Sequence, residues 1–318
     1  MGPCPRTILG TTAMFTALLM APGILLADDG ATGKTGDEVP SPLELVTLSS
    51  YVLGPLAVLI LYRSGFWRNP TTPEGPPPTP WRLPASLGIG LFFACFVLGG
   101  VGAGIIGSLL PPDVDRMLSV SATMWGGIAG MGCGCAIGGL AWHRFPKPAM
   151  APPVADLRTS LIKGLLAALL IIPIVQLVSS LGQLLQIWMS GTESSPLGHE
   201  TLRLMVESAG EPSWWLLAGA AVLGAPLVEE VMYRGLLQQS ARRVGVGPIW
   251  SSILTGGIFS LMHVPALPAE NRIAGLSGLL VLGIGLGLLR ERTGRLDSCI
   301  LVHVIFNGLN LLLATTVA

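Results

Sequence analysis

The sequence predicts an all-α fold: a polytopic bundle of about eight transmembrane helices, preceded by an N-terminal signal peptide or signal anchor. The first observation is composition, with 51% hydrophobic residues, 11% charged residues and a mean hydropathy of +0.67, whereas soluble domains contain about 25% charged residues. The second is a series of apolar runs, most of which approach the roughly 20 residues that cross a hydrocarbon core. A formal net charge of zero, without a long basic run, indicates no nucleic-acid partner.

Residues 1–27 have the features of a secretory signal peptide. Arg6 precedes an apolar stretch that contains the helix-weakening pair Pro22-Gly23. The stretch is long for a signal peptide and has no clean small-x-small cleavage site, so an uncleaved first span is the alternative. In both cases the polar segment 28–42 is expected outside the cytoplasm.

Eight further apolar runs are expected to be the transmembrane helices. They lie at residues 43–62, 85–110, 118–142, 164–189, 213–235, 248–265, 274–289 and 297–316. The Pro-rich segment 64–84 follows the first run, and its composition predicts a stiff, hydrated loop on the cytoplasmic side. The chain is thus divided into N-terminal transmembrane helices over 43–189 and a C-terminal helix bundle over 210–318.

The distribution of Lys and Arg between the loops predicts the orientation of the bundle. If the first span runs from outside to inside, the outer segments hold four basic residues, Lys34, Arg116, Arg203 and Arg272. The inner loops then hold twelve: Arg63, Arg68, Arg82, Arg144, Lys147, Arg158, Lys163, Arg242, Arg243, Arg290, Arg292 and Arg295. This asymmetry is the positive-inside pattern of short cytoplasmic loops. We therefore expect an integral, multi-pass membrane protein of a bacterial inner membrane.

Three charged residues interrupt the apolar run 213–235: the adjacent Glu229 and Glu230, and Arg234 one helical turn later. An ionised group inside a bilayer costs roughly 2.5–3.5 kcal/mol on insertion scales, so such groups persist where they pair, face a cavity or do chemistry. Glu230 and Arg234 share a helix face, whereas Glu229 lies about 100° away round the helix. We expect one carboxylate in a cavity and the other bound to Arg234 or to a neighbouring helix.

Two of the four histidines, His263 and His303, also lie inside apolar runs. Each has a partner one turn away on the same face, Phe259 for the first and Asn307 for the second. Counted from the turn that their two helices share, Glu229 and His263 both lie at roughly 21–23 Å, at about 1.5 Å per residue. The spacing predicts one intramembrane cavity that opens toward the cytoplasm.

Three ordered motifs in this part of the chain resemble those of the CPBP family, the CAAX protease and bacteriocin-processing (Abi) family of intramembrane endopeptidases. The resemblance covers about residues 210–318, and none is found for 43–189. The motifs EExxxR, FxxxH and HxxxN are matched by Glu229-Glu230-x-x-x-Arg234, Phe259-x-x-x-His263 and His303-x-x-x-Asn307.

The resemblance implies an endopeptidase, similar to CAAX prenyl protease 2, that hydrolyses a peptide bond in a membrane-embedded cavity. Glu229 would act as the general base on water, which His263 would help to hold. His303 and Asn307 would stabilise the oxyanion as hydrogen-bond donors. The partners would be a peptide or protein substrate, membrane-associated or lipidated, and membrane lipid. The remaining motif residues would support the site; these are Glu230, Arg234 and Phe259.

Three alternatives stay open at this point. Glu229, His263 and His303 are also a Zn²⁺ ligand set that leaves one position for water, although a mechanism without a cofactor is preferred because Asn307 is a poor zinc ligand. A transporter would keep charges at depth too, but no second Glu-Glu motif occurs in 43–189 to indicate paired halves. A non-catalytic scaffold would be expected to lose motif residues, and all of them are present.

Overall fold

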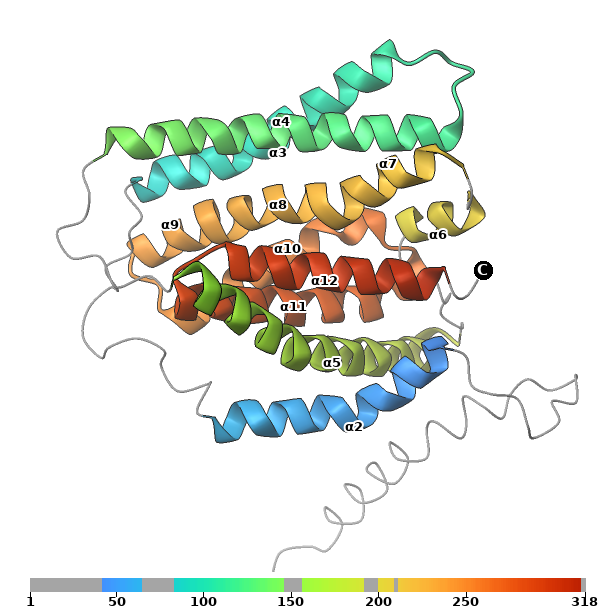
Figure 1. Ribbon diagram of the computed structural model, residues 1–318, viewed down its shortest axis with the longest axis vertical. Coiled ribbons are helices and arrows are strands. Elements are labelled where there is room, and N and C mark those ends of the chain that lie inside the picture. Colours follow the sequence, from blue (N-terminus) through green and yellow to red (C-terminus); the bar gives the residue numbers. More distant parts are fainter. Residues whose placement is uncertain (1–41, 65–82, 146–155, 192–199, 209–210, 316–318) are drawn as a thin grey trace, which may run out of the picture.

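The chain is a bundle of helices in the computed structural model (Figure 1). Residues 42–64, 83–145, 156–191, 200–208 and 211–315 are described, and they contain no strand. Eight segments in them are long and apolar enough to cross a membrane, which confirms the predicted polytopic bundle. The N-terminal segment 1–27, the polar segment up to residue 41 and most of the Pro-rich loop lie outside the described residues.

The helices agree with the predicted runs in number and order, and several extend further. One span runs continuously over Ser213–Arg243, where α-helical and π-helical turns alternate, and it is called the α7–α9 span below. The other helices are α2 (Pro42–Arg63), α3 (Ala85–Leu109), α4 (Arg116–Arg144), α5 (Leu157–Ser190), α6 (Glu200–Glu207), α10 (Pro248–Met262), α11 (Arg272–Thr293) and α12 (Asp297–Ala314).

Two of these helices depart most from the predicted runs. Helix α5 begins at Leu157, before the predicted run 164–189. The search for apolar runs left out its first turns because they contain Arg158 and Lys163. Helix α6 was not predicted, because it has only eight residues and no apolar run. It lies beside the start of α7 and the end of α12 (Figure 1).

The spans are layered (Figure 1). Helices α3 and α4 form a closely packed pair on one side, and α5 separates α2 from the remaining spans on the other. The α7–α9 span, α10, α11 and α12 lie between these layers. Glycines allow close approach: a Cβ on Gly256 of α10 would lie 2.7 Å from the Ile284 nitrogen of α11, and one on Gly283 would lie 2.7 Å from Gly256 Cα.

The two ends of the bundle differ in charge. Helices α2, α4, α9 and α11 all finish with basic residues in their last turn, and we call this the arginine end. The opposite end, which we call the α6 end, holds α6, the start of α7 and the end of α12 (Figure 1). With the orientation predicted by the positive-inside pattern, the arginine end faces the cytoplasm.

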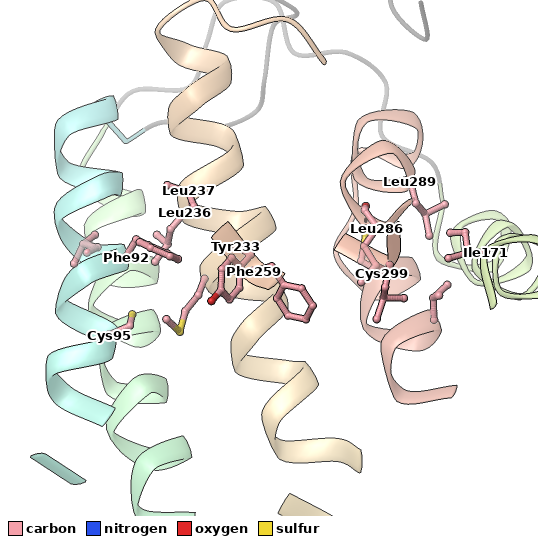
Figure 2. Packing of buried hydrophobic residues seen from close by; sticks show 14 of the residues in the cluster. Phe92, Cys95, Ile171, Tyr233, Leu236, Leu237, Phe259, Leu286, Leu289 and Cys299 are labelled. Atoms are coloured by element: carbon pink, nitrogen blue, oxygen red, sulfur yellow. Dashed lines mark hydrogen bonds between the residues drawn. The ribbon is translucent and has the colours of Figure 1, made fainter. Parts of the chain in front are cut away.

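The largest buried cluster of apolar side chains joins α3 to the C-terminal spans (Figure 2). Aromatic rings meet edge to face across it, with centroids 5.3 Å apart for Phe92 and Tyr233 and 5.2 Å apart for Tyr233 and Phe259. Such pairs are worth about 0.5–1.5 kcal/mol beyond their area burial. Phe259 ends this aromatic series beside the polar motif residues, so the core holds it against the candidate site.

Candidate functional site

The α7–α9 span changes its helical register on both sides of the two glutamates. Residues Ala220–Gly224 and Val231–Leu237 are π-helical, and the α-helical turns Ala225–Glu230 lie between them. The backbone N–H of Ala225 donates to the carbonyl of Ala220, five residues back. Such wide turns are rare and occur frequently at functional sites.

A proline in this segment leaves one backbone carbonyl without a backbone N–H donor on its own helix. In the wide register the carbonyl of Ala221 would accept from residue 226, which is a proline and has no N–H. The side chain of Asn307 on α12 replaces it, with its Nδ2 donating to the Ala221 oxygen over 2.8 Å. Pro226 therefore positions Asn307 indirectly, because it leaves the Ala221 carbonyl free to accept from the Asn307 side chain. Freed carbonyls in membrane helices are commonly satisfied by neighbouring side chains in this way.

Glu230 and Arg234 form an ion pair with no exposure to solvent. Arg234 Nη1 lies 2.9 Å from Glu230 Oε1, and both side chains are 0% exposed. Arg234 Nη2 donates to the carbonyl of Gly283 on α11 over 3.1 Å. The guanidinium also lies 5.0 Å from the centroid of the Phe259 ring. A buried charge of this kind is tolerated because it is paired and hydrogen-bonded.

His303 lies between the two glutamates. Its Nδ1 is 2.9 Å from Glu230 Oε1, and its Nε2 is 3.8 Å from Glu229 Oε2. The Glu229 side chain is 20% exposed, whereas that of Glu230 is 0% exposed. Two adjacent residues thus have different environments, the division between a cavity carboxylate and a paired carboxylate that their helical spacing predicts.

His263 ends α10 and is held by its own helix. Its Nδ1 lies 2.7 Å from the carbonyl oxygen of Phe259. Because a carbonyl can only accept, Nδ1 carries the proton and a neutral ring presents Nε2 as an acceptor. The Phe259 ring lies 4.6 Å from the His263 ring and 5.7 Å from the His303 ring. Phe259 is therefore an apolar spacer between the two histidines.

A cavity of about 360 Å³ brings the four proposed catalytic side chains together. Glu229, His263, His303 and Asn307 all line it. The supporting residues Glu230, Arg234 and Phe259 do not line it and are fully buried behind it. The site therefore has four residues that can meet a bound molecule and three that hold them.

The direction of the cavity differs from the sequence prediction. Most of its other lining residues come from the second half of α5, from α6, from the segment between α10 and α11, from the first turns of α11 and from the last turns of α12. All of these lie at the α6 end, opposite the arginine end. The expectation that the cavity opens toward the basic loops is wrong, because it counted the depth of Glu229 and His263 from one end only.

A polar ladder behind the site was missed by the sequence analysis. Gln238 Nε2 donates to the Gly287 carbonyl over 3.0 Å and to Glu291 Oε1 over 2.9 Å, and Arg242 Nε lies 3.2 Å from Glu291 Oε2. Together with the bond from Arg234 to Gly283, these contacts recur every four residues along the α7–α9 span and along α11. The signal is visible in the sequence as a polar residue at every fourth position: Glu230, Arg234, Gln238 and Arg242.

The described residues contain no three His, Cys, Asp or Glu side chains arranged to hold a metal ion. Both histidines nevertheless direct Nδ1 to an oxygen and leave Nε2 for another partner. Metal-ligating histidines usually have this arrangement, with a carboxylate or a carbonyl as the outer partner. The zinc alternative therefore rests on the chemical type and outer bonds of these donors, and not on a preformed ligand geometry.

The eight long apolar helices among the described residues define an integral multi-pass membrane protein. A carboxylate, two histidines and an amide surround its internal cavity. The comparison with family models gives the particular family. The model of the Rce1-like type II CAAX prenyl endopeptidases matches residues 211–309. This match covers the C-terminal part of the chain, includes all three motifs and supports the predicted resemblance to the CAAX protease family of peptide hydrolases. No curated protein and no solved structure matches the chain.

Proposed function

We propose that the protein is an intramembrane endopeptidase in which Glu229 activates water for attack on a peptide bond. The observation that carries the proposal is the cavity, which Glu229, His263, His303 and Asn307 line together. Among the described residues that line the cavity, Glu229 is the one that carries a carboxylate. The carboxylate of its neighbour Glu230 is paired with Arg234 and does not line the cavity. The substrate would be a peptide or protein segment, membrane-associated or lipidated.

Water would be held between Glu229 and His263. The fixed Nδ1 proton of His263 leaves Nε2 as an acceptor for one water hydrogen, and the Glu229 carboxylate accepts the other. When the water oxygen attacks the carbonyl carbon, Glu229 takes the proton and can later transfer it to the leaving amine. A positioned base of this kind contributes about 10²–10⁴-fold in rate.

The oxyanion would be stabilised from α12. Asn307 uses one N–H for the Ala221 carbonyl, and its second N–H is left for the substrate oxygen. His303 can donate from Nε2 only when it is doubly protonated, because Glu230 accepts from Nδ1. The carboxylates of Glu229 and Glu230 lie on both sides of that imidazolium. A preorganised donor is worth about 3–4 kcal/mol in comparable sites.

The zinc version of the proposal uses the same cavity. The Nε2 atoms of His263 and His303, together with Glu229, would supply the ligands, and a bound Zn²⁺ would lower the pKa of its water. Its support is the outer bond of each histidine, to Phe259 and to Glu230. Prolonged chelation that removes cleavage, followed by recovery with Zn²⁺, would select this version.

The test of the proposal compares the peptides of membranes that contain the wild-type protein with those that contain Glu229→Gln. Fragments that depend on the wild-type chain identify substrates, and the purified pair is then assayed on them. Glu207→Gln, the same change on the exposed face of α6, is the control. Full cleavage by the Glu229→Gln protein would contradict the role of this residue as the base.

A further inference from the structure

The position of the cavity along the bundle bears on which side of the membrane supplies the substrate. The lining runs from Glu229 and His303 to Thr201 and Met205 of α6 and to Leu313 near the end of α12. It includes Thr47 near the start of α2 and Gln183 near the end of α5, both of which lie at the α6 end. The described lining includes no residue of the α9 helix or of the last turns of α11.

The charges of the described residues orient this end relative to the membrane. The α6 end holds three basic residues, Arg116, Arg203 and Arg272. The arginine end holds nine: Arg63, Arg144, Arg158, Lys163, Arg242, Arg243, Arg290, Arg292 and Arg295. Acidic residues have the opposite distribution, and those at the α6 end include Glu44, Asp113, Asp115, Glu207, Glu211 and Glu270. Short loops rich in Lys and Arg stay in the cytoplasm, so the α6 end faces away from it.

Exposed tryptophans indicate the levels of the two membrane surfaces. Trp188 and Trp215 are 82% and 75% exposed and lie at the α6 end, whereas Trp250 is 69% exposed and lies at the other. Tryptophan is enriched at both membrane–water interfaces. Trp188 ends α5 two residues before Ser190, and Trp215 begins the α7–α9 span. The lining residues on α6 therefore lie close to the extracytoplasmic interface.

The lining between that interface and Glu229 carries few charges and is mainly apolar, with polar groups interspersed. It includes the hydroxyl of Ser179 and the amides of Gln183 and Asn310. The uncharged polar groups match a peptide backbone, which carries donors and acceptors without charge, and the apolar residues around them match apolar side chains. We propose that the cavity is entered from the extracytoplasmic side, and that the substrate is an extended segment of a membrane-bound or exported protein displayed on that side. This inference rests on the proposed function only for the identity of the bound chain.

Cysteine accessibility tests the direction of entry without any cleavage. Gln183→Cys and Asn310→Cys each place a thiol in the cavity, and Ser64→Cys places one at the exposed arginine end. All are made in a Cys4→Ser, Cys133→Ser chain, because Cys133 is exposed. A positively charged, membrane-impermeant methanethiosulfonate is applied to intact cells and to inside-out vesicles. Retention in the membrane and a single peak in size-exclusion chromatography show that each variant is folded.

The expected result is modification of both cavity thiols in intact cells, with Ser64→Cys modified only in inside-out vesicles. If folded Gln183→Cys and Asn310→Cys proteins react only in inside-out vesicles, or on neither side, the inference is overturned. A second experiment fuses one peptide library to the outer or the inner flank of a single-span reporter, with Glu229→Gln as the inactive control. Cleavage of the outer fusion alone is expected.

The two experiments separate the failure of this inference from the failure of the proposed function. Modification in intact cells without cleavage of either fusion would leave the entry side established and would contradict the protease. Cleavage of the inner fusion alone, with thiols that react only in inside-out vesicles, would support the protease and overturn the extracytoplasmic entry.

Discussion

The two halves of the α7–α9 span use their polar side chains in different ways. Toward the α6 end, Glu229 faces a cavity and lacks a close ion-pair partner, with His303 Nε2 at 3.8 Å. Toward the arginine end, every fourth residue from Glu230 onward forms a buried bond, to Arg234 or to α11. The polar side chains of the second half hold the α7–α9 span against α11, whereas Glu229 in the first half can contact a molecule in the cavity. Adjacent glutamates can differ this much because a helix turns about 100° per residue.

The largest expected effect comes from neutralising the two glutamates separately. Glu229→Gln should lower cleavage by about 10²–10⁴-fold, the range for a positioned general base, with little change in thermal stability, because Glu229 forms no tight pair. Glu230→Gln should lower both activity and melting temperature, because Arg234 and His303 lose the negative charge that both of them contact. Peptide cleavage and thermal unfolding in detergent measure the two properties. Equal destabilisation by both variants would remove the contrast between the halves.

A smaller effect is expected from breaking the buried ion pair from its other side. Arg234→Met leaves Glu230 buried without a cation, which typically costs about 3–5 kcal/mol. The control is Arg203→Met, because Arg203 lies 3.7 Å from Glu270 and both side chains are about one third exposed. Surface pairs contribute only about 0–1 kcal/mol. A melting temperature for Arg234→Met as high as that for Arg203→Met would show that the ladder does not fasten the helices.

The contact between α10 and α11 supports the ladder and can be tested with one methyl group. In Gly256→Ala the new Cβ would lie 2.7 Å from the backbone nitrogen of Ile284, so the helices must separate. Overpacking of this kind costs about 1–3 kcal/mol. The next residue is a matched control, since a Cβ on Gly257 meets nothing within 4 Å. Equal stability of Gly256→Ala and Gly257→Ala in thermal unfolding would contradict the close contact.

Much of the fold was predictable because lipid imposes one rule on every span. An apolar run of about 20 residues must be a helix there, and the eight runs are eight helices. Helix α6 was not predicted because it is short and polar, and the rule for membrane spans does not apply to it. The N-terminal signal segment lies outside the described residues and stays a prediction.

The site was predictable only as far as the spacing of residues on a helix allows. That spacing separated Glu229 from Glu230 and paired the latter with Arg234. It could not indicate which end of the bundle the cavity reaches, since Glu229 lies near the middle of the span Ser213–Arg243. Nor could it show that Asn307 binds a carbonyl freed by a distant proline, because that bond depends on the π-helical register of another span.

Loss of the bond between Asn307 and the Ala221 carbonyl has the smallest expected effect on stability. This bond also allows the structural role of Asn307 to be tested separately from its catalytic role. Asn307→Leu should cost about 1 kcal/mol in stability through the lost hydrogen bond and should also lose cleavage through the missing oxyanion donor. Adding Pro226→Ala restores a backbone N–H that can donate to Ala221 in the wide register. The double variant should therefore regain thermal stability but not activity, whereas recovery of both would show that Asn307 acts only by holding the helix.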